Sequence, residues 1–213
     1  MISKKSIEIF ISQLKNFKKP KENLEQYSID ETFWSELINY YRLKYEIPEI
    51  VWDFGAGTGK LSLPFIIMGS KELNFFEIDK DIIKTLKENI NKTSKIIKKE
   101  FNFNIFNENL LSFDFSKIDK EPDLIVMNPP YGTRNKGIDS KFLKIALNHN
   151  SKIITMHKSS TKNYIENIIK NKGRSFDVFD VDYKLKQTLK HHTKKIKEID
   201  VSLFIIEEKI EEK

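Results

Sequence analysis

From residue 49 onward, short runs of strand-forming residues alternate with longer segments in which apolar residues recur at helical spacing. Strands that alternate with helices favour a mostly parallel sheet covered by helices on both faces. The expected strands are 50–54, 73–78, 102–106, 124–127, 152–156, 176–181 and 200–206. The expected helices between them are 61–68, 81–92, 140–148 and 161–170.

A helical extension is expected ahead of this alternating part. A first amphipathic helix over 3–17 is predicted by Ile7, Phe10, Ile11, Leu14 and Phe17. Asp30, a residue type that caps helices, starts a second one whose buried stripe comprises Phe33, Trp34, Leu37, Ile38 and Tyr41. We therefore expect one domain over 1–213, with the extension at 1–48, an α/β core at 49–206 and a frayed tail at 207–213.

The composition limits the chemistry that is available. The chain has no cysteine and four histidines, which excludes disulfides and thiolate metal sites, and no metal site is expected. Lysine plus arginine number 37 against 31 acidic residues, and the net charge of +6 suits a polyanionic partner. Because no apolar run is long enough for a membrane span or a signal peptide, we expect no membrane association. The expected location is the cytoplasm, with the nucleus as a second compartment.

The first strand runs directly into a glycine-rich turn. This turn follows Asp53 and contains Gly55, Ala56, Gly57, Thr58 and Gly59. Three glycines in five positions let the backbone approach a ligand closely. A dinucleotide site needs G-x-G-x-x-G and a P-loop needs Gly-Lys-Ser/Thr, and neither is present. An acidic residue before the glycines suits a cofactor with a positively charged amino acid end better than a diphosphate.

Polar residues also follow the next two strands. Glu77 and Ile78 end the second strand, where a carboxylate can accept both hydroxyls of a ribose. Asn107 follows the third strand, where its amide can hydrogen-bond an adenine edge. Each residue alone would usually be an ordinary polar loop residue. Together with Asp53 they predict one nucleoside pocket at the carboxyl edge of the sheet.

The fourth strand ends in Asn128-Pro129-Pro130-Tyr131. Proline lacks an N–H and has a fixed φ, so two in a row end the strand ladder and hold the preceding carbonyl outward. The Asn128 side-chain oxygen and the Pro129 carbonyl can then accept hydrogen bonds from one NH2 group, and Tyr131 can stack on the flat molecule that carries it. For the tetrapeptide alone, an ordinary turn after a buried strand is the alternative.

In series, these motifs resemble the class I S-adenosylmethionine-dependent methyltransferases, and the 128–131 motif is similar to the signature of those that act on a conjugated amino group. The resemblance narrows to the methyltransferase-like protein 5 family, whose members install N6-methyladenosine on small-subunit ribosomal RNA. It rests on Phe-Lys-Lys-Pro-Lys at 17–21, Leu-Glu-Gln-Tyr at 24–27, Asn-Pro-Pro-Tyr-Gly-Thr at 128–133 with Asn-Lys-Gly at 135–137, and His-Lys-Ser-Ser-Thr at 157–161. The similarity runs from about residue 14 to about residue 206.

This resemblance implies a Rossmann-like, seven-stranded, mostly parallel sheet with the last strand antiparallel, and it implies roles for residues that match by position. Gln26 and Tyr27 would close over the methionine end of the cofactor, and Asp53 with the glycine turn would hold its amino acid part. Glu77 and Ile78 would hold the ribose and Asn107 the adenine, with Asn128 also beside the cofactor. Glu77 and Asn107 both depart from the Asp usual in the family, and both keep an acceptor oxygen.

Basic residues near the expected site predict contact with RNA. Arg134 and Lys136 lie in a loop able to close over a nucleotide, and the family match favours a substrate-side role for His157 and Lys158. Between the last two strands, an RNA-phosphate surface would be formed by Lys190, His192, Lys194 and Lys195. A solvated loop or hairpin is the alternative for each of these segments.

The resemblance also implies a partner, a small zinc-binding methyltransferase activator protein. The third strand would be an exposed edge, and we expect the activator to pair there, near Phe101, Phe103, Ile105 and Phe106. Two other functions stay open, a protein glutamine N5-methyltransferase acting on a release factor and a noncatalytic RNA-binding module. A DNA adenine methyltransferase is less favoured, because a separate target-recognition domain does not fit in 213 residues.

Overall fold

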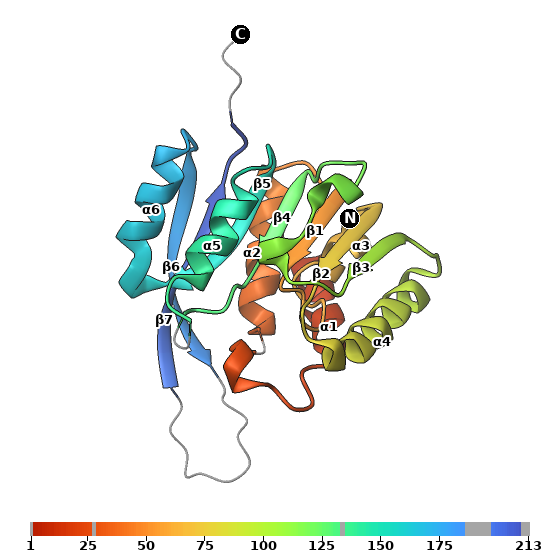
Figure 1. Ribbon diagram of the computed structural model, residues 1–213. Helices are drawn as coiled ribbons and strands as arrows, with labels where there is room; N and C mark the ends of the chain where they lie inside the picture. The colour runs from red at the N-terminus through yellow and green to blue at the C-terminus, as the bar shows by residue number, and fades with distance from the viewer. Residues whose placement is uncertain (1, 27–28, 133–134, 186–196, 210–213) are drawn as a thin grey trace.

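The computed structural model describes residues 2–26, 29–132, 135–185 and 197–209, with the backbone alone at 182–185 and 197–199. Its centre is a seven-stranded sheet (Figure 1). The strands are β1 (Ile50–Phe54), β2 (Glu72–Phe76), β3 (Asn102–Phe106), β4 (Leu124–Met127), β5 (Lys152–Lys158), β6 (Phe176–Leu185) and β7 (Lys197–Ile206). Their spatial order is β3-β2-β1-β4-β5-β7-β6. Only β7 pairs antiparallel, with β5 and β6, which confirms the predicted fold class.

The strand order reverses between β1 and β4, which are parallel neighbours in register from Val51↔Leu124 to Phe54↔Met127. This reversal places the turn after β1 beside the turn after β4. In open α/β sheets such a switch point, at the carboxyl ends of the strands, is where ligands bind. The fold therefore brings the glycine turn and the 128–131 motif together, as their places on the sequence predict.

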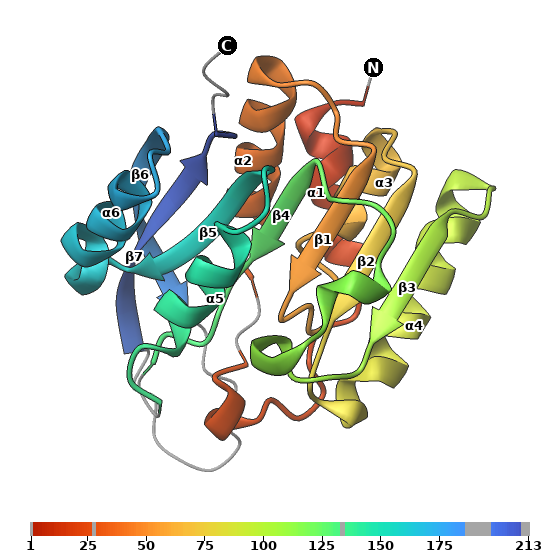
Figure 2. The same ribbon diagram turned by 45° about the horizontal axis from the view of Figure 1, so that its top comes forward.

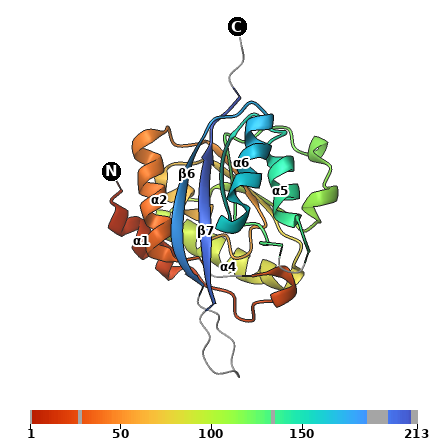
Figure 3. The ribbon, with the colours of Figure 1, turned by 90° about the vertical axis from the view of Figure 1, so that its left-hand side faces the viewer.

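Helices cover both faces of the sheet (Figure 3). They are α1 (Lys4–Gln13), α2 (Glu31–Lys44), α3 (Leu63–Met68), α4 (Lys80–Ile97), α5 (Ile138–Ala146) and α6 (Lys162–Asn171). The helices α1 to α4 enclose one hydrophobic core and α5 and α6 enclose the other. Alternate residues of β4 divide between the two cores, with Val126 in the first and Met127 in the second, because successive side chains of a strand point to opposite faces. Within the described ranges, no helix combines the length and apolarity needed to cross a bilayer.

The first helix is shorter than predicted, and the difference shapes the site. It ends at Gln13 because the Lys15 N–H donates instead to Asn89 Oδ1 of α4, at 2.7 Å. Asn89 in turn donates to the carbonyls of Lys15 and Thr58. The predicted last turn of the helix, over 14–17, is therefore an extended segment. It carries Phe17 out of the helix and onto the glycine turn.

Other boundaries also differ from the prediction. The helix α4 continues to Ile97, and its buried Thr93 bonds back to the Asn89 carbonyl. The strands β6 and β7 are each ten residues long, since their antiparallel pairing continues to Leu185↔Lys197, beyond the edge of the other strands. In α2, Asp30 accepts from the Phe33 N–H as the predicted N-cap, whereas the Phe33 side chain is only partly buried.

Candidate active site

A cavity of about 660 Å³ lies at the carboxyl ends of β1, β2 and β4. The segment around the short 3-10 helix η1 (Glu22–Leu24) crosses this end of the sheet (Figure 2). The glycine turn, the ends of β2 and β4, the loop after β3 and the start of α5 supply the remaining walls. The lining includes most of the residues predicted to hold the cofactor, namely Gln26, Gly55, Ala56, Gly57, Thr58, Glu77, Ile78 and Asn128.

Glu77 ties the glycine turn to the end of β2. Its Oε2 atom accepts from the Gly57 N–H at 2.7 Å and its Oε1 atom accepts from the Asp79 N–H at 2.8 Å. Burial raises the pKa of this carboxyl, and the two N–H donors oppose that effect. Each carboxylate oxygen can accept more than one hydrogen bond, so Glu77 can hold the turn and also receive two hydroxyls from the cavity.

Gly57 is required by its surroundings. Its φ is +53°, a conformation that L side chains rarely adopt. A Cβ atom at this position would lie 2.7 Å from Phe17 Cζ. The Phe17 ring therefore covers the glycine turn and lines the cavity. Although the sequence contained the 17–21 motif, helical periodicity placed Phe17 on a helix and hid this role.

Two apolar side chains of the cavity wall are exposed to solvent. Ile78 is 51% exposed and Leu111 is 37% exposed, although both line the cavity. Large apolar residues left open in a concave site are typical of a wall that receives a flat apolar group such as a nucleobase. Ile78 was predicted for the site, whereas Leu111 was not.

Asn128 carries the most distinctive polar atom of the site. Its Oδ1 atom is buried and has no hydrogen-bond partner among the described residues, although Asn128 lines the cavity. An unsatisfied buried acceptor costs about 1–3 kcal/mol, which indicates that a ligand donor completes it. Pro130 also lines the cavity, whereas Pro129 is buried outside the lining, so the acceptor role predicted for the Pro129 carbonyl does not fit this arrangement.

Tyr131 lies elsewhere than predicted. Its ring is 5% exposed, belongs to the hydrophobic core under α1 to α4, and does not line the cavity. The prediction that Tyr131 stacks on a ligand is wrong for this arrangement. Because the two prolines fix the chain direction, the residue after them points back into the core rather than toward the open end of the sheet.

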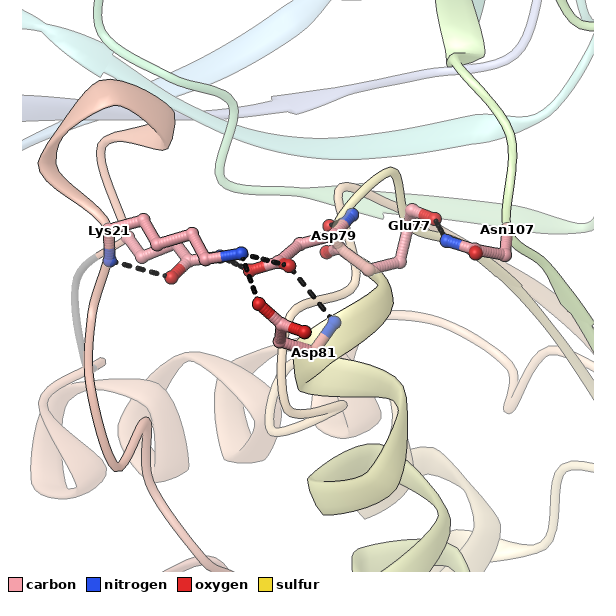
Figure 4. Close-up of polar contacts among 6 residues, drawn as sticks. Lys21, Glu77, Asp79, Asp81 and Asn107 are labelled. Atoms are coloured by element: carbon pink, nitrogen blue, oxygen red, sulfur yellow. Dashed lines mark hydrogen bonds and ion pairs between the residues drawn. The ribbon is translucent and has the colours of Figure 1, made fainter.

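Gln26 belongs to a polar clasp that fastens the N-terminal segment to the start of α4. Figure 4 shows the Lys21, Asp79 and Asp81 members of this clasp. Its Nε2 atom donates to Asp79 Oδ2 at 2.8 Å, and its Oε1 atom accepts from the Lys21 N–H at 2.9 Å. The Lys21 ammonium contacts Asp79 at 2.6 Å and Asp81 at 2.7 Å. Burial alone would raise the pKa of Asp79, but the hydrogen bonds from Lys21 and Gln26 hold it below its usual value. Tyr27, predicted to act beside Gln26, lies outside the described residues.

Asn107 does not reach the cavity. Its Nδ2 atom donates to the Glu77 backbone carbonyl at 2.7 Å, which joins the loop after β3 to the end of β2 (Figure 4). The predicted contact of Asn107 with adenine is therefore wrong for this arrangement, since the amide is engaged outside the lining. Glu108 and Asn109 line the cavity instead. No periodicity signal separates these neighbours in the sequence, because which of them faces the cavity depends on how the loop turns after β3.

Asp53 and Gly59 also lie behind the lining. Asp53 is fully buried, its Oδ2 atom accepts from Ser62 Oγ at 2.6 Å, and its Oδ1 atom has no hydrogen-bond partner in the described part of the chain. Burial raises the pKa of Asp53 to about 7, and the nearby Glu77 carboxylate adds to the effect. Because Asp53 does not line the cavity, the direct contact predicted between Asp53 and the cofactor does not fit this arrangement. The Asp53 carboxyl lies behind the glycine turn.

This raised pKa predicts a pH dependence of stability. The folded protein holds the Asp53 proton more tightly than the unfolded chain, so its contribution is present below about pH 4 and is lost as the pH rises through about 7. The Asp53→Asn variant has no charge to bury. Relative to the wild type, its free energy of unfolding in urea should therefore be higher at about pH 8 than at about pH 5. An equal difference at both pH values would contradict this.

His157 is fully buried, so the substrate contact predicted for it does not fit the structure. Its Nδ1 atom lies 3.1 Å from Asp139 Oδ2 at the start of α5, and its Nε2 atom lies 3.0 Å from Thr155 Oγ1. Burial lowers the pKa of His157 despite Asp139, which favours the neutral ring. The imidazole therefore joins the end of β5 to the start of α5, where the loop that begins at Asn128 ends.

Removal of this anchor should destabilise the protein. The His157→Ala variant leaves the buried Asp139 carboxylate without its partner, and we expect the free energy of unfolding to fall by about 1–3 kcal/mol in urea. Adding Asp139→Asn should recover part of that loss, since a neutral amide is cheaper to leave unpaired than a carboxylate. Equal stabilities of the single and double variants would contradict the pairing.

The predicted RNA-binding residues fall into two groups. Lys136 is exposed and lines the cavity, and Lys158 is half-buried at the end of β5. The other predicted positions lie outside the described residues: Arg134, Lys190, His192, Lys194 and Lys195. Cavity-lining residues to which the sequence assigned no role include Glu25, Lys60, Asn135 and Lys141.

Comparison with known proteins places this site in a family. A family model described as Conserved hypothetical protein 95 matches residues 32–199. The rRNA N(6)-adenosine-methyltransferase Mettl5 of Drosophila melanogaster is 30% identical over 209 residues, which cover 95% of each chain. The chain belongs to the methyltransferase-like protein 5 family. An uncharacterized protein of Methanocaldococcus jannaschii is 29% identical and covers 97% of this chain and 95% of its own.

Solved structures support the same placement of this methyltransferase-like protein 5 family member. A crystal structure from Pyrococcus horikoshii, described as a candidate RNA methyltransferase, is 28% identical, has a TM-score of 0.80 and covers 100% of both chains. The magnesium protoporphyrin IX methyltransferase of Synechocystis, solved with bound S-adenosylmethionine, shares the fold at 10% identity, with a TM-score of 0.58 and coverage of 81% of this chain and 77% of its own. The family and the fold make S-adenosylmethionine the cofactor of this chain.

The residues present fit that cofactor. Glu77 offers acceptor oxygens for a ribose, and Ile78 with Leu111 offers apolar walls for the adenine. The glycine turn and Gln26 also line the cavity and remain for the methionine part. Asn128 stands where these walls meet the end of β4, as a site for methyl transfer requires.

Proposed function

We propose that this chain transfers a methyl group from S-adenosylmethionine to N6 of an adenosine in small-subunit ribosomal RNA. The observation that carries the proposal is the buried Asn128 Oδ1 atom, an acceptor that lines the cavity and has no partner among the described residues. The substrate class is supported by the family, whose Drosophila member is named an rRNA N(6)-adenosine-methyltransferase.

The chemistry explains why an acceptor is needed. S-adenosylmethionine supplies an electrophilic methyl group on a sulfonium centre. The adenine amino nitrogen is a poor nucleophile because its lone pair is delocalised into the ring. Asn128 Oδ1 would accept a hydrogen bond from one N–H of this amino group, which localises electron density on the nitrogen and fixes its direction of attack.

The rest of the site positions the base. An adenine must leave its stack to enter a cavity at the end of a sheet, and Pro130 offers it an apolar surface beside Asn128. Lys136 and Lys141 also line the cavity and suit the phosphates of the flanking nucleotides. Tyr131 has no direct part in this mechanism, since its ring lies in the core.

The test is a methyl-transfer assay with purified small-subunit ribosomal RNA and, in parallel, a translation release factor. Mass spectrometry of the nucleosides should find N6-methyladenosine in the RNA. Methylglutamine in the release factor, with no change in the RNA, would favour the glutamine N5-methyltransferase instead. Failure to bind S-adenosylmethionine by calorimetry, with any partner present, would favour a noncatalytic RNA-binding module.

We also propose that a small zinc-binding activator protein pairs with β3. This strand stands at one edge of the sheet, and Phe103 is 39% exposed with its ring 5.9 Å from that of Phe101. An open strand edge with an exposed aromatic residue is suited to strand addition. Methyl transfer and heterodimer formation should therefore depend on the same edge.

The opposite edge provides a matched control. Phe179 on β6, the other edge strand, is 37% exposed. When the chain is co-expressed with the activator, Phe103→Lys should reduce the heterodimer in size-exclusion chromatography, whereas Phe179→Lys should not. Full activity of the chain as a monomer would contradict the proposed partnership.

A further inference from the structure

Lys60 is a buried lysine on the cavity wall. It is 4% exposed and follows the last glycine of the turn after β1. Its Nζ atom lies 2.7 Å from Glu31 Oε1 in the first turn of α2, and no other polar partner of this ammonium is found among the described residues. The ammonium group therefore lies where the glycine turn meets the N-terminal segment that leads into α2.

The electrostatics of Lys60 are incompletely balanced by this contact. Moving an ammonium ion out of water costs several kcal/mol unless close partners compensate. Its single partner, Glu31, is one-third exposed, and an ammonium group has three N–H donors. A cavity-lining cation with spare donors is suited to an anionic ligand group.

The other cations of the wall differ in position and burial. Among the described residues, the lysines that line the cavity are Lys60, Lys136 and Lys141. Lys136 and Lys141 are exposed and come from the loop after β4 and the start of α5. Lys60 alone comes from the end of the glycine turn, the segment that remains for the methionine part of the cofactor.

We propose that the Lys60 ammonium binds the carboxylate of the methionine part of S-adenosylmethionine. Glu31 holds the Lys60 ammonium in place. The buried Glu25 also lines the cavity, and its negative charge suits the ammonium group of the cofactor. The inference rests on the cofactor site and is independent of which nucleoside is methylated.

The experiment compares two ligands that differ in one group. Isothermal titration calorimetry gives Kd for S-adenosylmethionine and for decarboxylated S-adenosylmethionine, which lacks the carboxylate. The wild type should bind the first about 10- to 100-fold more tightly, as expected for hydrogen bonds between charged groups. In Lys60→Met this ratio should fall to near one through weaker binding of S-adenosylmethionine alone, and Lys60→Arg should restore most of it.

Two further variants keep the test sharp. Lys141→Met, near the start of α5, should leave the ratio unchanged. Glu31→Gln removes the ion pair but keeps Lys60, so the ratio should persist even if the melting temperature falls. The proposal is overturned if Lys60→Met keeps the wild-type ratio, or if it weakens both ligands equally, which would make Lys60 a purely structural link. Absence of binding by the wild type would instead count against the cofactor site itself.

Discussion

The Asn128→Ala variant should retain S-adenosylmethionine binding and lose methyl transfer, with kcat lower by about 10²–10³, the usual cost of removing one preorganised transition-state hydrogen bond. The reason is that Asn128 Oδ1 is the buried, cavity-lining acceptor that has no partner among the described residues. The measurement is single-turnover methyl transfer to small-subunit ribosomal RNA, with calorimetry for the cofactor. An Asn128→Ala protein that is folded and transfers methyl groups at the normal rate would contradict the role of Asn128 as the acceptor.

A second asparagine of the cavity lining provides a matched control. Asn135 also lines the cavity but is exposed, so an alanine at that position removes an amide that water already satisfies. We expect Asn135→Ala to change kcat far less than Asn128→Ala. Asn128→Asp keeps an acceptor oxygen at the same place and should retain more activity than the alanine variant.

The Glu77→Ala variant should raise Kd for S-adenosylmethionine by at least about 100-fold, because two hydrogen bonds to a charged acceptor are each worth about 1.5–3 kcal/mol. The variant loses the proposed acceptors for the ribose and also the contacts that hold the Gly57 and Asp79 N–H groups. Isothermal titration calorimetry measures the first effect and urea unfolding the second.

Two variants separate these effects. Glu77→Gln keeps one acceptor oxygen and the side-chain shape, so its affinity should lie between those of the wild type and the alanine variant. Glu108→Gln changes an acid that lines the same cavity from the loop after β3 and should have little effect. Wild-type affinity in a stable Glu77→Ala protein would remove Glu77 from the cofactor site.

Much of the architecture could be predicted because local patterns of apolar, polar and turn residues determine the strands and helices. The strands β1, β3 and β4 begin and end at the predicted residues, since β1 and β4 are short, mostly apolar runs and β3 alternates polar and apolar residues. The alternation of strands and helices predicted the parallel sheet, and a parallel sheet brings the carboxyl ends of its strands to one edge. That rule was sufficient to place the glycine turn, Glu77 and Asn128 around one cavity.

The errors concern side-chain direction within segments that were themselves placed well. Asn107 and Tyr131 follow the predicted strands, yet the first binds the Glu77 carbonyl and the second enters the core. The family match predicted a substrate-side role for His157, but this side chain is fully buried against Asp139. In each case the partner that decides the direction lies on another element.

The sequence by itself determined which segments form the parallel sheet and which residue types gather at the carboxyl ends of its strands, because these follow from periodicity and from the geometry of parallel strands. Only the tertiary structure decided which atoms face the cavity. The bond from Lys15 to Asn89 ends α1 early and brings Phe17 over Gly57, and the Lys60 ammonium meets Glu31 of α2. Such contacts join residues about 30 to 75 positions apart, as Lys60 to Glu31 and Lys15 to Asn89 are, so no local pattern can encode them.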